Sequence, residues 1–394
     1  MALTHHLKSK LSPVRQFLYE SAPHFLLAGS RGHLGKDIAR EFRFDELMAQ
    51  ELAFPVPEAV KDKRSHSAPV GTAFDYRARM MLGGFTPEGT VALVGLQTFQ
   101  QNTLGIRRGK HMARVLTEAF RLASDQAEDG IEEDRDRLSV VLAWCESFYR
   151  AGVYTVVEGS LGKQLRKVAS GADLLEAIDP LMLSDLAALR AGAADQIEDW
   201  SQAIGAGMRF EPNPSFSGSG MVGGADADWM IGDTLIDCKS TEQLTNPWIR
   251  DTLFQLLGYS LLDFDDALRI RQLAIWLPRR RALQTWNLDQ ILERPAEEAL
   301  PDLRERFQEA LRAWHQQMAE EAKARREAWA KWRDEFDAEM KRQEEAEAAK
   351  SEERRAKRRE ADRKRREAKR TAVRIGESVQ PATTDRVSQT TDSI

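Results

Sequence analysis

The sequence predicts a mixed α/β protein in which a largely helical N-terminal half precedes a short sheet-forming region. Apolar residues recur at helical spacing from Gln97 to Ala127 and from Asp134 to Ala151. The stretch Gly207–Ser240 instead combines glycines and turn signals with alternating apolar residues, a pattern typical of strands. Over residues 207–288 the expected order is strand, strand, strand, helix, strand, strand. That order indicates an α/β or α+β core.

Length and charge leave several classes of partner open. The chain has 394 residues, of which 42% are hydrophobic, enough for one large domain or two ordinary ones. The formal net charge is −5, but Arg354–Arg374 holds twelve Lys or Arg residues against three Asp or Glu. Positive charge is therefore concentrated in one segment, which either grips phosphates or simply keeps an exposed helix in solution.

Compartment signals are few. Cys145 and Cys238 are the two cysteines, and neither lies in a spacing typical of zinc sites or disulfide frameworks. The segment Met1–Glu20 lacks the continuous apolar core of a secretory signal, and no run approaches the roughly 20 apolar residues of a membrane span. We therefore expect a cytoplasmic protein without membrane partners.

The first two regions are predicted to be helical. Residues 1–90 read as helices with a break at Phe54–Val70, a stretch that contains Pro55, Pro57 and Pro69. Residues 91–205 form a helical subdomain or insertion, whose last helix is expected from Leu181 to Ile204.

Residues 206–295 are the expected α/β core. Three strands are predicted before Ser240, and a helix follows with Thr245 and Asn246 as capping candidates and Pro247 at its first position. Two further strands are expected at Arg271–Leu277 and Leu283–Leu288.

Residues 296–372 are expected to form one long charged helix, regular from Asp302 onward. Its apolar positions are spaced three or four apart and would pack on the body of the protein or on another copy. They are Leu303, Phe307, Leu311, Trp314, Met318, Trp329, Trp332, Phe336 and Met340. The 300–345 part is thus a candidate coiled coil or partner-binding helix. Beyond Met340 the helix should be solvated, and residues 373–394 are expected to be disordered.

One predicted hairpin carries the candidate chemistry. If Gly232-Asp233 is a two-residue type II′ turn, the strand register is fixed. Asp228 then lies opposite Asp237, and Asp226 lies opposite Lys239. The period of two places these four charged residues on one face of the hairpin. On the other face, Trp229, Ile231, Ile236 and Cys238 should be core, which makes Cys238 a packing residue.

Two opposed carboxylates repel each other unless a positive charge lies between them. Magnesium prefers oxygen ligands and is commonly held by one or two carboxylates together with substrate phosphate. Lys239 would reach the same space, where its ammonium could orient or deprotonate a water or stabilise charge on a phosphate. Asp228 and Asp237 are the favoured ligands, while Asp226 is either a rival ligand or a salt-bridge partner of Lys239.

The segment Asp228…Asp237-Cys238-Lys239 resembles the Asp…(Asp/Glu)-x-Lys motif of the PD-(D/E)XK nuclease superfamily. The next helix carries Gln255 and Tyr259, which match the Gln-x-x-x-Tyr motif of RecB-type members. The resemblance covers roughly residues 208–288. It implies a restriction-endonuclease-like core with a mixed central sheet, bound Mg²⁺ that Mn²⁺ would replace, and hydrolysis of phosphodiester bonds in DNA. It also implies that Gln255 and Tyr259 assist the hydrolysis from a helix beside the active site.

A weaker resemblance lies upstream, in the predicted helix 71–82. In such nucleases the helix before the strands often supplies an acidic ligand, and Asp75 is the candidate here. Residues 91–205 would then be an insertion between the first core helix and the first strand. The alternative is that Asp75 belongs to an ordinary charged helix face with Arg77 and Arg79.

Other functions remain open from the sequence alone. Gln255 and Tyr259 would otherwise be polar positions on a mostly buried helix. A nuclease-like fold without activity would be a nucleic-acid-binding module. The long C-terminal helix would suit a coiled-coil interaction protein.

Overall fold

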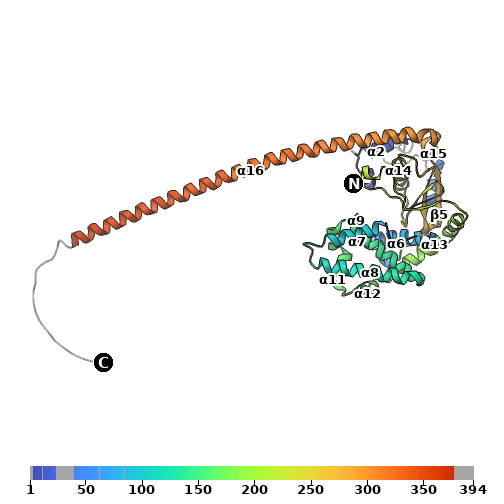
Figure 1. The fold of residues 1–394 in the computed structure, drawn as a ribbon, viewed down its shortest axis with the longest axis horizontal. Helices are drawn as coiled ribbons and strands as arrows, with labels where there is room; N and C mark the ends of the chain where they lie inside the picture. Colours follow the sequence, from blue (N-terminus) through green and yellow to red (C-terminus); the bar gives the residue numbers. More distant parts are fainter. Residues whose placement is uncertain (1–2, 11, 24–39, 62, 84, 377–394) are drawn as a thin grey trace, which may run out of the picture. The chain divides into compact units, whose positions relative to one another are not determined.

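The computed structural model describes residues 3–10, 12–23, 40–61, 63–83 and 85–376, and it contains helices around one five-stranded mixed sheet (Figure 1). The strands are β1 (Phe210–Pro212), β2 (Trp229–Ile231), β3 (Thr234–Cys238), β4 (Gln272–Leu277) and β5 (Ala282–Asn287). The chain divides into two compact units, residues 1–315 and 316–394. The mixed α/β class expected from the sequence is therefore confirmed.

Helices precede, interrupt and follow the strands. Those before the sheet are α1 (Leu3–Lys8), α2 (Pro13–Ser21), α5 (Phe44–Ala49), α6 (Arg64–Leu82), α7 (Val91–Gln101), α8 (Gly109–Asp129), α9 (Glu132–Arg150), α10 (Val153–Glu158), α11 (Ser160–Lys167), α12 (Gly171–Glu176) and α13 (Pro180–Gly205). The later ones are α14 (Asn246–Leu262), α15 (Leu288–Leu292) and α16 (Ala296–Gly376). Short 3₁₀ turns are η2 (Glu58–Val60), η3 (Ser219–Val222) and η4 (Pro278–Arg280).

The strands lie in sequence order across the sheet. β1, β2 and β3 are antiparallel neighbours, β3 and β4 are parallel, and β4 and β5 are antiparallel. Parallel neighbours need a crossover, and α14 provides it between β3 and β4. The candidate site is thus built on a β-α-β unit that begins with a hairpin.

The register of the β2–β3 hairpin agrees with the sequence prediction. Trp229 pairs with Ile236 and Ile231 pairs with Thr234, which leaves Gly232 and Asp233 as the two turn residues. Gly232 has φ of 61°. A positive φ at the first turn position favours glycine, so the turn itself sets the pairing.

Each face of the sheet packs against its own group of helices (Figure 1). Trp229, Ile236 and Trp276 belong to the core that includes α6 to α9 and α13, and Cys238 packs against it as expected. Leu235 and its neighbours on the opposite face belong to the core that includes α2, α14 and α15. Because strand side chains alternate, the hairpin is apolar on both faces until it reaches its charged end.

A buried ion pair connects the helical region to the segment after β3 that contains Lys239. The guanidinium of Arg279 donates to both oxygens of Asp185 on α13, at 2.7 and 2.9 Å, and His66 Nε2 lies 3.0 Å from the same carboxylate. Arg279 Nε also donates to the carbonyl of Ser240 at 2.6 Å. Breaking such a buried pair from one side is strongly destabilising, so this cluster fixes the backbone next to Lys239.

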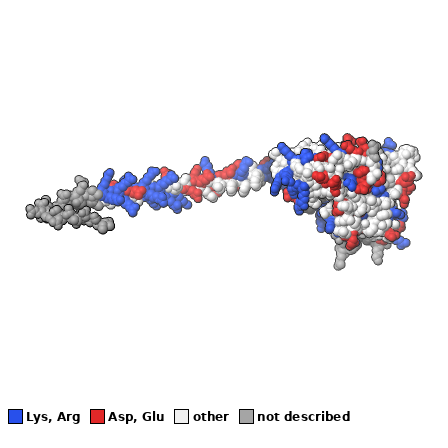
Figure 2. All heavy atoms as spheres, turned by 90° about the horizontal axis from the view of Figure 1, so that it is seen from below, with Lys and Arg blue, Asp and Glu red and all other residues white. Residues whose placement is uncertain are grey.

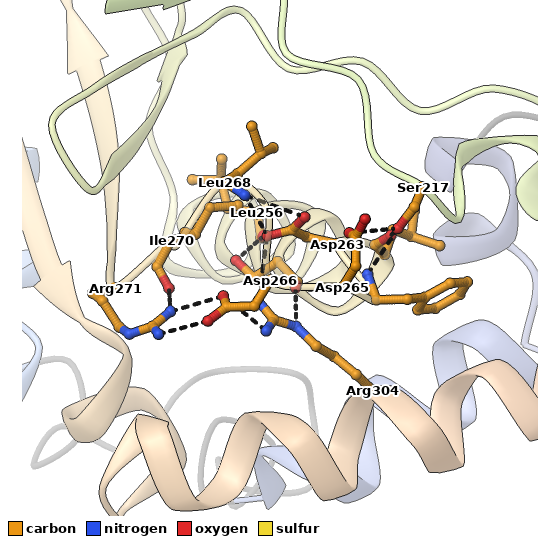
Figure 3. Close-up of polar contacts among 12 residues, drawn as sticks. Ser217, Leu256, Asp263, Asp265, Asp266, Leu268, Ile270, Arg271 and Arg304 are labelled. Carbon is orange, nitrogen blue, oxygen red and sulfur yellow. Dashed lines mark hydrogen bonds and ion pairs between the residues drawn. The ribbon is translucent and has the colours of Figure 1, made fainter. Parts of the chain in front are cut away.

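The two ends of α14 are held by polar contacts. At its start, the Thr245 hydroxyl accepts a hydrogen bond from the backbone N–H of Trp248, which confirms Thr245 as the N-cap. Beyond its last turn, Figure 3 shows Arg304 of α16 reaching Asp266, at 2.8 Å, and Asp263, at 3.5 Å. Arg271 pairs with Asp266 from the other side at 2.7 Å. These contacts join the first turns of α16 to the α14–β4 connection.

Two predicted boundaries were wrong. The expected break at Phe54–Val70 ends at Arg64, where α6 begins. Pro69 lies inside this helix and removes one backbone hydrogen bond, but the burial of Val70, Ala73 and Phe74 more than compensates for that loss. The expected helix Gln97–Ala127 is two helices, α7 and α8, separated by Asn102–Arg108.

The long C-terminal helix begins at Ala296, the start of its expected range, and is already regular before Asp302. The Ala296 N–H donates to Asp289 at 2.7 Å. Pro301 lies inside this helix. The helix continues through it because the neighbouring Ala299, Leu300 and Leu303 are buried.

From residue 316 onward α16 is a charged helix with an exposed aromatic segment. Trp329, Trp332 and Phe336 are 64%, 50% and 50% exposed and stack on one another, with ring centroids 4.8 and 5.3 Å apart. Beyond them Lys and Arg side chains crowd the helix (Figure 2). The seam predicted to pack from Leu303 to Met340 is thus buried at Leu303, Phe307 and Leu311. Its later members are exposed, namely Trp329, Trp332, Phe336 and Met340.

Most of the tail predicted to be disordered, residues 377–394, lies outside the described residues. Residues 373–376 still belong to α16. None of the helices in the described parts of the chain combines the length and apolar character that a membrane span requires.

Candidate functional site

The open end of the hairpin brings Asp228, Asp237 and Lys239 together, as the sequence predicted. Asp237 is 2% exposed, and both of its carboxylate oxygens lie 2.7 Å from Lys239 Nζ. Asp228 directly precedes β2, and its Oδ2 accepts a hydrogen bond of 2.6 Å from the backbone N–H of Cys238. The two carboxylates therefore lie at the same end of the hairpin, Asp228 just before β2 and Asp237 within β3.

The surroundings of Asp237 disfavour its charged form. Burial raises the pKa of Asp237 to about 6, Lys239 acts in the opposite direction, and the neighbouring Asp228 raises the pKa further. Desolvation is thus the main cause, and the lysine compensates for it only in part. A carboxylate in this state gains most from a second, stronger positive charge.

Lys239 keeps its proton at neutral pH. Burial alone would lower the pKa of Lys239, but Asp237 and then Asp228 more than offset that effect, so the pKa is raised. The backbone N–H of Lys239 donates to the carbonyl of Trp276 on β4 at 2.8 Å, which fixes the position of the residue just beyond β3. Such a lysine is suited to stabilising negative charge rather than to accepting a proton.

Asp75 on α6 also reaches this site. It forms an ion pair with Arg79 one turn later on the same helix. Burial raises the pKa of Asp75 well above its usual value, Arg79 lowers it, and the nearby carboxylates of Asp228 and Glu146 raise it. The structure thus brings Asp75 into the electrostatic neighbourhood of Asp228, with its charge already balanced by an arginine.

Glu146 on α9 is a member of the cluster that the sequence analysis did not single out. Its buried carboxylate accepts hydrogen bonds from the Tyr76 hydroxyl and from the guanidinium of Arg150. A signal was present in the sequence, because Glu146 interrupts an apolar helical stretch between Cys145 and Phe148. A charged residue on a buried helix face needs a partner or a function.

Asp226 is held by Arg150 rather than by Lys239. Arg150 Nη2 lies 2.7 Å from Asp226 Oδ2, and the same guanidinium contacts Glu146. The backbone of Asp226 forms an isolated bridge with Ser215. The salt bridge to Lys239 that the register suggested is replaced by the Lys239–Asp237 pair.

Gln255 and Tyr259 face the site from α14. Gln255 Nε2 donates to the Tyr259 hydroxyl at 2.9 Å, and the Tyr259 ring stacks on Phe216 with centroids 5.2 Å apart. Burial raises the pKa of Tyr259, and the carboxylate of Asp237 raises it further. The two residues of the Gln-x-x-x-Tyr motif therefore act as one hydrogen-bonded pair near Asp237.

The charged cluster carries more carboxylates than cations. The acidic members are Asp75, Glu146, Asp226, Asp228 and Asp237, and the basic members are Arg79, Arg150 and Lys239. If all are ionised, the excess is two negative charges, the amount that one divalent cation balances. Within the described ranges, no three His, Cys, Asp or Glu side chains lie close enough together to form a metal site by themselves.

Comparisons of the chain with models of known protein families, with curated proteins and with solved structures found no match.

Proposed function

We propose that this protein is a magnesium-dependent nuclease of the PD-(D/E)XK type that hydrolyses phosphodiester bonds in DNA and has a restriction-endonuclease-like core. The single observation that supports the proposal most is the arrangement at the open end of the hairpin. There Asp228 accepts a hydrogen bond from the backbone N–H of Cys238, the residue after Asp237. Lys239 Nζ lies 2.7 Å from Asp237. The excess negative charge of the surrounding cluster supports the same proposal.

Asp228 and Asp237 are the proposed magnesium ligands, and manganese would replace magnesium there. Two carboxylates fit this cation, because Mg²⁺ keeps several waters and shares its remaining positions with substrate phosphate. When bound, the ion would supply Lewis-acid polarisation of the phosphate and a more acidic water. We assign Asp75 and Asp226 supporting roles beside Arg79 and Arg150, and we assign the metal to Asp228 and to Asp237, whose own partner is the proposed catalytic Lys239.

The chain's own residues would perform the remaining tasks. Lys239 holds its ammonium beside the ligand Asp237, where it would stabilise charge that develops on the phosphate. The Gln255–Tyr259 pair would orient the bound strand or Lys239 through its hydroxyl and amide.

A second candidate is a nuclease-like module that binds nucleic acid without cutting it. The Lys239–Asp237 ion pair favours this candidate, because it already neutralises one of the two proposed ligands. Partner binding through the exposed 329–340 segment of α16 would be compatible with either function.

Cleavage of DNA is the direct test. We expect the purified protein to cut linear, circular or single-stranded DNA when Mg²⁺ is present and to stop when EDTA is added. Lys239→Ala should lower the rate by about 10²–10³, the usual effect of losing one charge-stabilising group. Lys163→Ala, which changes an exposed lysine on α11, is the matched control. Undiminished cleavage by a folded Lys239→Ala protein would overturn the catalytic proposal.

Metal binding separates the two candidates. In titration calorimetry with Mn²⁺, Asp228→Asn and Asp237→Asn should each abolish the binding heat, because each removes half of the proposed protein ligands. Asp226→Asn should retain it, since that carboxylate pairs with Arg150. Binding of Mn²⁺ that is equally tight in all three variants would contradict the proposed site.

A further inference from the structure

A cavity of about 410 Å³ opens directly beside the candidate site. Its wall includes Lys239 and Gln255 of that site, Trp248 from the first turn of α14, and residues of the N-terminal helices α1 and α2. Its size falls in the range of small-ligand pockets. The cavity therefore extends the candidate site toward the N-terminal helices.

The N-terminal wall of the cavity is fixed to the core. Leu3 packs against Gly258 of α14, where an added Cβ would lie 3.0 Å from the Leu3 side chain, and the Leu3 N–H donates to the Gly224 carbonyl. On α2, Tyr19 packs on Phe254 with ring centroids 4.7 Å apart. The cavity is thus part of the folded unit rather than a gap beside a loose terminus.

The cavity is positively charged. Lys8 and Arg15 contribute two cations to its wall, and the third, Lys239, is paired with Asp237. The acidic lining residue, Asp251, is neutralised by its neighbour Arg250, whose guanidinium lies 2.8 Å away. An anionic ligand is therefore favoured.

Flat aromatic surfaces lie among these cations. Tyr19 and the half-buried Trp248 line the same space, and the guanidinium of Arg15 lies over the Tyr19 ring at 4.8 Å. Cations that follow a phosphate backbone, interleaved with aromatic rings that stack on bases, are the combination by which proteins hold single-stranded nucleic acid. A base inside a duplex has no free face to offer to such a ring.

We propose that this cavity holds an unpaired nucleotide of the substrate strand, with its phosphate at Lys8 and Arg15 and its base on Trp248 or Tyr19. This inference rests on the proposed function, because Lys239 and Gln255 belong both to the cavity and to the catalytic site. The enzyme should then prefer single strands or duplexes with unpaired ends over continuous duplex.

The test measures binding of the full chain to labelled oligonucleotides in EDTA, where no cleavage occurs. The single-stranded oligonucleotide should bind at least tenfold more tightly than the same sequence as a blunt duplex. Lys8→Gln/Arg15→Gln and Trp248→Ala should each weaken single-strand binding about tenfold, the effect of losing one stacking or phosphate contact. The double variant should also flatten the slope of log affinity against log salt by about 0.7, because it removes the contact to one phosphate of a single strand.

Lys10→Gln/Arg64→Gln is the matched control. It removes the same charge from exposed positions that do not line the cavity, and it should bind like the unchanged protein. Trp248→Leu repeats the aromatic test with apolar volume retained, in case Trp248→Ala unfolds. Unchanged single-strand affinity in the folded Lys8→Gln/Arg15→Gln and Trp248→Leu proteins would overturn the inference, as would equal affinity of the unchanged protein for the blunt duplex.

The two proposals fail separately. If the unchanged protein cleaves DNA but the cavity variants bind normally, the inference fails and the nuclease proposal stands. If the variants lose single-strand binding but no DNA is cleaved with Mg²⁺, the cavity still binds nucleic acid and the catalytic proposal fails.

Discussion

Asp237 is the residue at which the fold and the candidate chemistry conflict most directly. It lies almost completely buried, with one lysine as its ion-pair partner and with Asp228 close enough to raise its pKa. A core is often at least as stable with apolar residues in place of both members of such an ion pair. Strongly perturbed groups of this kind gather at functional sites, which is why Asp237 supports the proposed function.

The raised pKa of Asp237 predicts how stability changes with pH. Between about pH 4 and pH 6 the folded protein keeps a proton that the unfolded chain has released, so stability falls as pH rises through this window. The rise of the Asp237 pKa to about 6 corresponds to about 3 kcal/mol. In EDTA, Asp237→Asn should therefore flatten the profile of unfolding free energy between pH 4 and pH 7, measured by urea unfolding.

The control for this profile is Asp302→Asn, which changes a carboxylate with a 57% exposed side chain and should leave the slope as it is. Other buried carboxylates such as Asp75 contribute equally to both proteins and cancel in the difference. A slope in Asp237→Asn that equals the slope of the unchanged protein would contradict the assignment.

At the scale of elements, the helices pack closely on the face of the sheet where α6 carries Asp75 and α9 carries Glu146. α7 and α9 approach so closely that a Cβ on Gly95 would fall on the carbonyl oxygen of Cys145, next to Glu146. The stacked rings of Phe99 and Phe148, with centroids 4.1 Å apart, belong to the same contact. Any displacement of α9 would therefore move Glu146 and Arg150 relative to the hairpin.

Gly95→Ala should consequently destabilise the protein by about 1–3 kcal/mol, the usual range for overpacking. The measurement is the free energy of unfolding in urea. Gly205→Ala is the matched change, because nothing lies within 4 Å of its added Cβ at the exposed end of α13. There alanine should be neutral or stabilising by up to about 1 kcal/mol. Equal effects at the two positions would show that the α7–α9 contact is looser than described.

At the scale of the whole molecule, the chain divides into two units, residues 1–315 and residues 316–394, and the described part of the second unit is helical. The first part of α16 belongs to the first unit, because Leu303, Phe307 and Leu311 are buried in it. The later part of α16 carries the basic stretch Arg354–Arg374.

Ending the chain after His315 should leave the first unit folded, with an unfolding midpoint in urea within error of the full chain. Magnesium-dependent cleavage should persist, since every proposed site residue lies before that point. Affinity for duplex DNA should fall and lose much of its salt dependence, because the basic stretch has been removed. A chain that unfolds on truncation, or one whose salt dependence is unchanged, would contradict this division of roles.

Much of the site could be predicted from the sequence, because local rules determine it. A two-residue turn that begins with Gly232 fixes the register, and the register places Asp228 and Asp237 at the same end of the hairpin. Helical spacing likewise places Gln255 and Tyr259 on one face of α14. Strand patterns likewise predicted the five strands, whereas the mixed sheet was expected only from the family resemblance.

What only the tertiary structure decided involves residues far apart in the chain. Glu146 and Arg150 reach the hairpin from α9, and Lys8 and Arg15 reach the cavity from the N-terminus. Their positions depend on packing between helices. No periodicity or turn signal in the sequence predicts how close two distant helices lie. The pairing of Asp226 with Arg150 was decided in the same way. Local geometry thus determined the residues that carry the proposed chemistry, and long-range packing determined the charges that surround them.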